Sequence, residues 1–273
     1  MVAVIILLVL LILGELFTLT LQCRRGHSAW GLLRLFRYAH RGYHDKPVVP
    51  ENSLPAFRRA IEHGWGAELD VHLMKDGTLA VIHDSSLLRT AGADVQIEDL
   101  TREELENYRL EGTDERIPLF DEVLALFENT TPLIIELKAA NGNHFALSKA
   151  VCERLDSYKG VFCIESFDPM VVADVRELRP GICRGQLAEN FLKGKGALDP
   201  VRSVLATGLI GNALAKPDFI AFKFEDRSCI SNALCLKLWG IQGVAWTIRS
   251  KHDLLTAEAE GLIPIFEKFD PEA

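Results

Sequence analysis

The sequence predicts an α/β fold, a (β/α)8 TIM barrel with an added β-hairpin, preceded by one N-terminal transmembrane helix. Nine short apolar runs alternate with amphipathic helical patterns, and one Asp-Gly turn joins two of the runs. Alternating β and α segments favour a parallel sheet. Roughly 235 residues follow the apolar leader, close to the ~250 of a typical β/α barrel. Nine runs with one tight hairpin therefore fit eight barrel strands and one antiparallel return strand.

Residues 1–22 are predicted to form a transmembrane anchor. Met1 to Leu21 is apolar apart from Glu15 and a few hydroxyl side chains, and about 20 apolar residues span a bilayer. A secretory signal is the weaker interpretation, because no basic region precedes the segment and no small-residue cleavage site follows it. Glu15 argues against a membrane span, because placing a carboxylate inside the bilayer costs free energy. Four arginines follow: Arg24, Arg25, Arg34 and Arg37. By the positive-inside rule, they place a single-pass protein with its C-terminal domain in the cytoplasm.

Residues 23–36 are predicted to form a juxtamembrane segment, and residues 37–273 the barrel domain. The amphipathic, aromatic stretch 28–36 has two interpretations of equal weight. It lies at the membrane interface, or it is a first helix that packs under the barrel.

The predicted strands are the runs 37–40, 67–73, 79–83, 133–138, 161–166, 182–187, 219–224, 243–248 and 262–266. Helix signals stand between them, such as Ser53 before an amphipathic run and Thr101 with Glu104 as a capping box. The other predicted helices are 121–127, 145–155, 170–178, 229–239 and 252–260. The stretch 189–216 departs from this alternation of strand and helix signals, because Gly194 and Gly196 precede a group of apolar residues. A core helix is the preferred interpretation there, and a membrane-facing or substrate-lining loop is the alternative.

Charge and cysteine usage limit the possible functions. The formal net charge of −8 opposes binding to nucleic acid through bulk electrostatics. The six cysteines show no CxxC pair and no metal-type spacing, and several lie in apolar runs. They are interpreted as reduced core residues, which agrees with a cytoplasmic domain. No protein partner is evident.

Residues 67–84 are predicted to form a β-hairpin with one polar face. Apolar residues alternate there with Glu68, Asp70 and His72, and Asp76-Gly77 is typical of a two-residue turn. Such a turn places Asp70 directly opposite His83, with Glu68 as the next neighbour. A face of this kind is costly to bury unless something binds there. A solvated outer face is the alternative.

Further polar residues are expected at the carboxyl ends of the barrel strands, where active sites of this fold lie. The first run ends in His40-Arg41-Gly42, and run 133–138 carries Glu136 and Lys138 on one face. Carboxylates that converge from two strands repel one another unless a cation neutralises them. An all-oxygen set suits one divalent cation, Mg²⁺ or Ca²⁺, rather than zinc.

Together these residues resemble the glycerophosphodiester phosphodiesterase family. The resemblance runs from about Tyr38 to the C-terminus. It rests on five motifs in order: His40-Arg41-Gly42, Pro50-Glu51-Asn52-Ser53, Glu68-x-Asp70, His83-Asp84 and Glu136-x-Lys138. Each motif alone is weak, because His40 could be a core histidine and Glu136 with Lys138 a structural ion pair. Five such motifs in order at compatible spacing are specific for the family.

The resemblance implies a β/α barrel that binds one divalent cation and cleaves a phosphodiester between glycerol and an alcohol. It implies Glu68, Asp70 and Glu136 as metal ligands and His40 with His83 as the general acid/base pair. Arg41 and Lys138 would hold the phosphate. Glu51 would contact the metal site or the glycerol, and Trp246 would lie over the glycerol, although a core tryptophan is nearly as well supported. His44, His63, His72 and His144 are assigned surface or structural roles.

One departure from the family pattern lies at the end of the chain. The family usually ends in Gly-x-Asp-Gly-Ile-x-Thr-Asp-x-Pro, whereas the stretch 261–271 reads GLIPIFEKFDP. This departure bears on the geometry of the last strand and on the substrate pocket more than on the chemistry, because the metal and histidine motifs lie elsewhere.

The resulting hypothesis is a membrane-anchored, metal-dependent hydrolase of glycerophosphodiesters, with membrane-derived lysophospholipids as a further substrate class. A lysophospholipase D-type enzyme or a cyclic-phosphate-forming lyase on the same scaffold is the alternative, because the nucleophile is water or the glycerol 2-hydroxyl. A non-catalytic membrane-tethered binding barrel belongs to another class. A nuclease is disfavoured by the charge.

Overall fold

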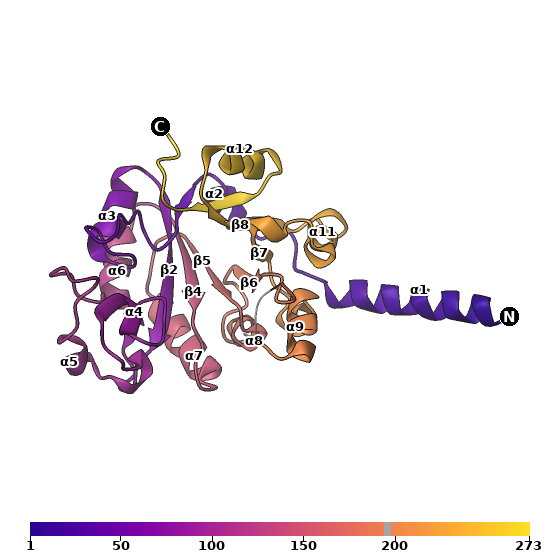
Figure 1. Cartoon of the computed structure of the whole chain (residues 1–273), viewed down its shortest axis with the longest axis horizontal. Helices are drawn as coiled ribbons and strands as arrows, with labels where there is room; N and C mark the ends of the chain where they lie inside the picture. The colour runs from indigo at the N-terminus through magenta and orange to yellow at the C-terminus, as the bar shows by residue number, and fades with distance from the viewer. Residues whose placement is uncertain (194–197) are drawn as a thin grey trace.

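The computed structural model describes residues 1–193 and 198–273, and a closed barrel of parallel strands forms its centre (Figure 1). The strand order is β1-β9-β8-β7-β6-β5-β4-β2, and β2 pairs in turn with β1, which closes the barrel. β3 pairs antiparallel with the outer part of β2. The fold is therefore a TIM barrel with one added strand. The strands are β1 (Tyr38–Ala39), β2 (Gly66–Leu73), β3 (Leu79–Val81), β4 (Leu133–Leu137), β5 (Phe162–Ser166), β6 (Arg184–Ala188), β7 (Phe219–Lys223), β8 (Gln242–Ile248) and β9 (Ile263–Phe266).

Helices surround the barrel, and an apolar core joins their inner faces to the outer face of the strands. Apart from α1, which projects from the domain (Figure 1), the described helices belong to the barrel domain. The helices are α1 (Val2–Thr20), α2 (Trp30–Leu33), α3 (Leu54–Glu62), α4 (Leu88–Ala91), α5 (Arg102–Leu105), α6 (Phe120–Phe127), α7 (His144–Leu155), α8 (Pro169–Leu178), α9 (Pro200–Thr207), α10 (Asn212–Ala215), α11 (Ile230–Lys237) and α12 (Lys251–Ala259). Two 3-10 turns, η1 (Ile97–Asp99) and η2 (Phe224–Asp226), complete the described elements.

All nine predicted strands are confirmed. The predicted helix starts are confirmed as well: Ser53 accepts a hydrogen bond from the backbone N–H of Ala56 at the start of α3, and Thr101 with Glu104 forms the capping box of α5. The departure from the family pattern at the end of the chain does not disturb the last strand. β9 pairs with both β1 and β8 and closes the barrel.

The stretch 28–36 packs under the barrel. Trp30 and Leu33 of α2 are buried in a cluster inside the amino-terminal end of the barrel, and the ring of Trp30 meets that of Phe219 edge to face at 5.2 Å. The Tyr38 hydroxyl donates a hydrogen bond to the Leu33 carbonyl at 2.8 Å. Of the two interpretations left open above, the structure thus favours the packed helix.

Helix α1 projects away from the barrel, and none of its residues is buried (Figure 1). It is long and apolar enough to cross a membrane by length and composition, a test that a signal sequence also passes. Its end is tied to the domain, because Leu21 is buried and the indole N–H of Trp239 donates a hydrogen bond to the Thr18 carbonyl at 3.1 Å.

The predicted register of the hairpin is wrong by one residue. Val71 pairs with Val81 and Leu73 with Leu79, which places Ile82 rather than His83 opposite Asp70. The turn is the reason: Met74 and Thr78 close a three-residue loop instead of a two-residue loop. Only Gly77 has positive φ, at 88°, as in a three-residue hairpin that ends in a left-handed residue.

The core-helix interpretation of 189–216 is wrong for α9. Val201, Val204 and Leu205 of this helix are exposed, and the next buried apolar side chain is Leu209, beyond its end. An apolar spacing of three and four residues predicts a helix with one apolar face, but it does not say what covers that face. Gly194 and Gly196 lie outside the described residues.

Candidate active site

A pocket of about 170 Å³ lies at the carboxyl ends of the barrel strands, where the fold places active sites. A larger cavity of about 650 Å³ lies near Arg34 and Trp65 at the other end, away from the predicted chemistry. The smaller pocket is lined by most of the predicted residues: His40, Arg41, Glu68, His83, Glu136, Lys138 and Trp246. The strand ends therefore bring together side chains from distant parts of the chain.

Three buried carboxylates form the floor of the site. Glu68 and Asp70 point from β2 and Glu136 from β4, and one oxygen of each lies within 4.8 Å of the others. Their exposed fractions are 2%, 0% and 7%. Burial, followed by the charges of Asp70 and Glu136, raises the pKa of Glu68 well above its usual value. Carboxylates crowded in this way fit a hard divalent cation, which would replace their mutual repulsion with attraction.

Two cations of the chain border this floor. The Lys138 ammonium lies 3.0 Å from Asp70 Oδ1 and 2.8 Å from Glu136 Oε1. Arg41 has φ of 59°, and its backbone N–H donates to Glu68 Oε2 at 3.0 Å. Burial opposes the ionisation of Asp70, but Lys138, His83 and Arg41 offset it and lower the pKa of Asp70.

The tight path after β1 requires a glycine. Gly42 follows Arg41 with φ of 79°, and a Cβ atom there would lie 2.9 Å from the backbone of Ala56 in α3. This close approach of β1 to α3 explains the glycine in the His-Arg-Gly motif, because no other residue fits.

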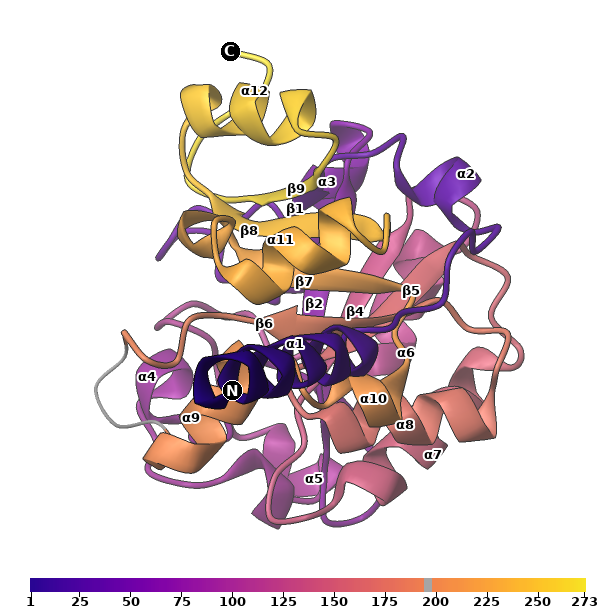
Figure 2. The ribbon, with the colours of Figure 1, turned by 90° about the vertical axis from the view of Figure 1, so that its right-hand side faces the viewer.

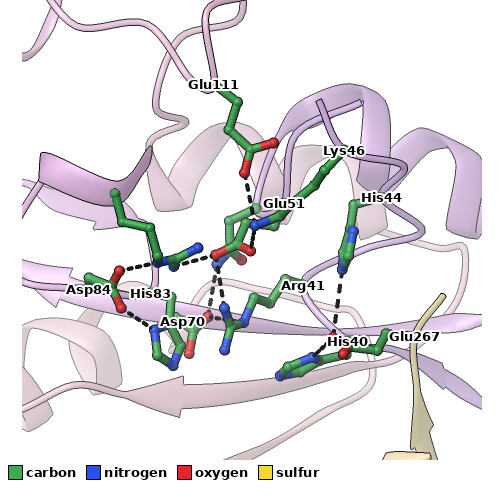
Figure 3. Close-up of polar contacts among 12 residues, drawn as sticks. His40, Arg41, His44, Lys46, Glu51, Asp70, His83, Asp84, Glu111 and Glu267 are labelled. Carbon is green, nitrogen blue, oxygen red and sulfur yellow. Dashed lines mark hydrogen bonds and ion pairs between the residues drawn. The ribbon is translucent and has the colours of Figure 1, made fainter. Parts of the chain in front are cut away.

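His40 is held by a residue that the sequence analysis did not select. His40 Nδ1 lies 2.7 Å from Glu267 Oε2, directly after β9 (Figure 3). A carboxylate only accepts, so the proton lies on Nδ1 and leaves Nε2 as the acceptor, 3.9 Å from Glu68 Oε2. Burial lowers the pKa of His40 to about 4, although Glu267 opposes this. The imidazole is therefore neutral near pH 7.

His83 lies at the more exposed side of the pocket. Its Nδ1 is 2.6 Å from Asp84 Oδ1, and burial lowers its pKa. His72 contacts the backbone of His83: its Nε2 lies 3.2 Å from the His83 carbonyl oxygen, and its Nδ1 lies 2.6 Å from Glu98 Oε1. This position of His72 agrees with the structural role assigned to it.

Glu51 is surrounded by cations of the chain (Figure 3). Its carboxylate accepts from Arg41 at 2.8 Å and from Arg89 at 2.6 Å, and it also contacts Lys46. Burial opposes ionisation, but these cations lower the pKa of Glu51. The neighbouring Asn52 donates from Nδ2 to Asp70 Oδ2 at 2.8 Å. The Glu-Asn pair thus orients Arg41 and Asp70.

Three of the residues that line the pocket carry a buried polar atom without a hydrogen-bond partner among the described residues. The atoms are Arg41 Nε, Glu165 Oε2 on β5 and Trp246 Nε1 on β8. Glu165 lies beside Glu136 in the β4–β5 register, and burial raises its pKa well above its usual value. A hydroxyl-rich ligand would supply the partners that these atoms lack.

Sequence reasoning missed Glu267, Asn52 and Glu165 as site residues. Asn52 belongs to the motif Pro50-Glu51-Asn52-Ser53, in which the resemblance implies a site role for Glu51 alone. Glu267 falls in the stretch that departs from the family pattern, so no motif marked it. For Glu165, the available signal was a carboxylate inside an apolar run at the carboxyl end of a strand.

A family model described as the glycerophosphoryl diester phosphodiesterase family matches residues 40–266. A glycerophosphodiester phosphodiesterase of Caldanaerobacter subterraneus subsp. tengcongensis is 37% identical over 161 residues, which cover 55% of this chain and 65% of that protein. Lysophospholipase D GDPD1 of Homo sapiens is 37% identical over 133 residues, which cover 44% of this chain and 40% of that protein. The match thus spans less than two thirds of either relative.

A solved phosphodiesterase of Oleispira antarctica, in complex with the product sn-glycerol-3-phosphate, has a similar fold. The TM-score is 0.69 at 22% sequence identity, and the match covers 85% of this chain and 92% of that chain. At this identity the likeness supports the barrel fold.

Proposed function

Because the chain belongs to the glycerophosphoryl diester phosphodiesterase family, we propose that it is a metal-dependent hydrolase of glycerophosphodiesters. The observation that carries this proposal is the convergence of three carboxylates, two histidines and two cationic side chains on one pocket. A non-catalytic binding barrel has no need of that combination.

We assign the metal site to Glu68, Asp70 and Glu136, with Mg²⁺ or Ca²⁺ as the cation. A cation bound there polarises a phosphoryl oxygen and stabilises the negative charge that develops on it. Lys138 and Arg41 both lie next to Asp70, and they hold the phosphate. Trp246 packs on the glycerol part of the substrate, at the wall of the pocket.

The two histidines move the protons. Neutral His40 accepts the proton of the attacking oxygen at Nε2, because Glu267 holds the proton on Nδ1. His83 stands at the more exposed rim, where the alcohol leaves. In its protonated form, which Asp84 favours at Nδ1, it donates the Nε2 proton to the leaving alkoxide. The phosphorus–oxygen bond to the alcohol breaks as the bond to the attacking oxygen forms. The products are glycerol phosphate and the free alcohol.

Lysophospholipids are the second substrate class that we propose. Two observations favour it: α1 is long and apolar enough to cross a membrane, and one relative is a lysophospholipase D. A membrane-anchored enzyme works where single-chain lipids are concentrated. We place the catalytic domain on the cytoplasmic side, in agreement with the six unpaired cysteines, most of which are buried. Protease protection of the domain in sealed vesicles tests this orientation, and digestion of the domain from the non-cytoplasmic side contradicts it.

The decisive experiment is choline release from glycerophosphocholine and lysophosphatidylcholine by the detergent-purified full chain. We expect release that requires a divalent cation, stops with EDTA and falls by roughly 10²- to 10⁴-fold in His40→Ala. His144→Ala is the matched control, because His144 pairs with Asp174 at 2.6 Å away from the pocket. Phosphorus NMR of the product separates glycerol phosphate from a cyclic phosphate. Absence of release with either substrate and either metal refutes the proposal.

A further inference from the structure

Helix α9 lies on the side of the domain from which α1 projects (Figures 1 and 2). Figure 2 looks along α1 and shows α9 and α10 on one side of it and α11 on the other. Val201, Val204 and Leu205 are three and four positions apart, so they share one face of α9, and all three are exposed. Leu192, in the loop after β6, is exposed as well. A contiguous exposed apolar face of this kind marks an interaction surface.

The direction of α1 relative to this face is fixed by contacts with the domain. Trp239 donates to the Thr18 carbonyl, and Leu21 packs in the core beside α11. Arg24 pairs with the buried Asp218 and donates to the Pro180 carbonyl at 2.7 Å. A bilayer that α1 crosses therefore begins close to the surface of α9, α10 and α11 (Figures 1 and 2).

The loop that carries Leu192 connects the exposed apolar residues with the pocket. The loop after β6 leaves the barrel at the carboxyl ends of the strands, and it carries Phe191 next to Leu192. The Phe191 ring lies 6.1 Å from that of Phe167, which lies 5.7 Å from that of Trp246 in the pocket wall. A row of aromatic rings thus connects the exposed apolar residues to the site.

The charge of this part of the chain favours an anionic lipid surface as its partner. Between Asn190 and Gly240 the sequence has seven lysines and arginines against four aspartates and glutamates, in a chain whose net charge is −8. Basic residues near an anionic leaflet strengthen binding that apolar side chains provide.

We propose that the apolar face of α9, together with Leu192, rests on the bilayer that α1 crosses, and that a single-chain lipid phosphodiester reaches the pocket from this surface past Phe191 and Phe167. The second half rests on the proposed function. The first half rests on the proposed membrane span of α1 and not on the catalytic activity.

Photo-crosslinking of the full chain tests the contact directly. A photoreactive benzoyl-phenylalanine replaces Val204 in one variant and Leu255 in a matched control, because both side chains are 56% exposed and Leu255 lies on α12. Each variant is reconstituted in vesicles of phosphatidylcholine and phosphatidylglycerol. We expect lipid adducts at position 204 and none at 255 by mass spectrometry. Equal yields at the two positions overturn the proposal, and so does a crosslink from 204 to a second copy of the chain.

The route is tested by comparing two substrates in the same vesicles. In Val201→Ser/Val204→Ser we expect the rate with vesicle-borne lysophosphatidylcholine to fall roughly tenfold relative to that with soluble glycerophosphocholine, a change that corresponds to about 1.4 kcal/mol. Leu255→Ser keeps the ratio of the parent chain. An unchanged ratio in the α9 variant overturns the route. Absence of hydrolysis of both substrates by the parent chain refutes the proposed function, and the crosslink still decides the contact with lipid.

Discussion

Glu267 shows how one side chain can organise a site from outside the metal cluster. It lies 2.7 Å from His40, 3.8 Å from His44 and 2.7 Å from the Arg249 guanidinium. Burial opposes its ionisation, but these neighbours, His40 first, lower the pKa of Glu267 so that it remains a carboxylate. The family pattern has a threonine and an aspartate near this position. In this chain Glu267, directly after β9, keeps the proton of His40 on Nδ1.

Replacing Glu267 therefore tests a positioning role. In Glu267→Gln the side-chain size is kept, but the acceptor that holds the proton on His40 Nδ1 is weakened. We expect kcat to fall by roughly 10- to 100-fold, the usual effect of losing a partner behind an active-site ligand, with KM nearly unchanged. Steady-state kinetics measure both constants. Glu258→Gln is the control, because Glu258 pairs with Arg37 at the opposite end of the barrel. Equal kcat values for the two variants contradict the assigned role.

Most site residues were predictable because each ends a strand that the local pattern already identifies. His40, Glu136 and Lys138 needed only a strand and the rule that active sites lie at the carboxyl ends. Glu267 was not predictable, since its role depends on a neighbour 227 positions away and on a motif that this chain has altered. Spatial pairs of this kind leave no local signal.

The positions of the strands follow from local sequence patterns, whereas the register in which they pair does not. The hairpin register depended on whether one or two turn residues have positive φ, and only Gly77 does. The error in register did not separate the site residues, because β3 ends at Val81 and His83 continues into the loop that forms the rim. The apolar pattern of α9 was visible, but a pattern does not distinguish a protein core from a bilayer.

Helix α3 begins at a cap formed by Ser53. The Ser53 hydroxyl donates to the Pro50 carbonyl at 2.7 Å and accepts from Ala56, and the residue is fully buried. Ser53→Ala should lower the free energy of unfolding by about 1–2 kcal/mol. It should also reduce activity, because the adjacent Asn52 holds Asp70. Ser250→Ala removes the corresponding cap of α12 and should lower stability alone. Denaturant unfolding measures the stability of both variants, and steady-state kinetics measure their activity. If Ser53→Ala is as active as Ser250→Ala, the cap of α3 does not influence the site through Asn52.

Helix α2 packs with Trp30 and Leu33 into the apolar cluster at the amino-terminal end of the barrel. Because Trp30 fills the amino-terminal end of the barrel against Phe219, Trp30→Ala should destabilise the protein by about 3–5 kcal/mol. Leu35→Ala, in the same segment but largely exposed, should change stability by less than about 0.5 kcal/mol. Thermal unfolding in detergent measures both. If the segment lay in the bilayer instead, the tryptophan variant would unfold at the parent temperature.

If the three carboxylates bind a cation as proposed, the stability of the whole barrel should depend on that cation. The barrel brings three carboxylates from β2 and β4 together, and Lys138 is the ammonium in direct contact with two of them. Burial raises the pKa of Glu136 to about 7, with Lys138 opposing and Asp70 adding to the effect. A carboxyl group whose pKa is higher in the folded chain favours folding while it is protonated. The metal-free protein therefore loses this contribution as pH rises from about 4.5 towards 7.

A divalent cation should reverse that loss, and the reversal should grow with pH because the ligands bind as carboxylates. We expect the melting temperature with excess Mg²⁺ or Ca²⁺ to exceed that with EDTA by more at pH 8 than at pH 6. At a cation concentration 100 times the Kd, the stabilisation amounts to about 2.7 kcal/mol. Glu136→Gln should abolish most of the shift, whereas Glu153→Gln, an exposed carboxylate on α7, should keep it. An equal shift at both pH values would mean that the cation binds away from the three carboxylates.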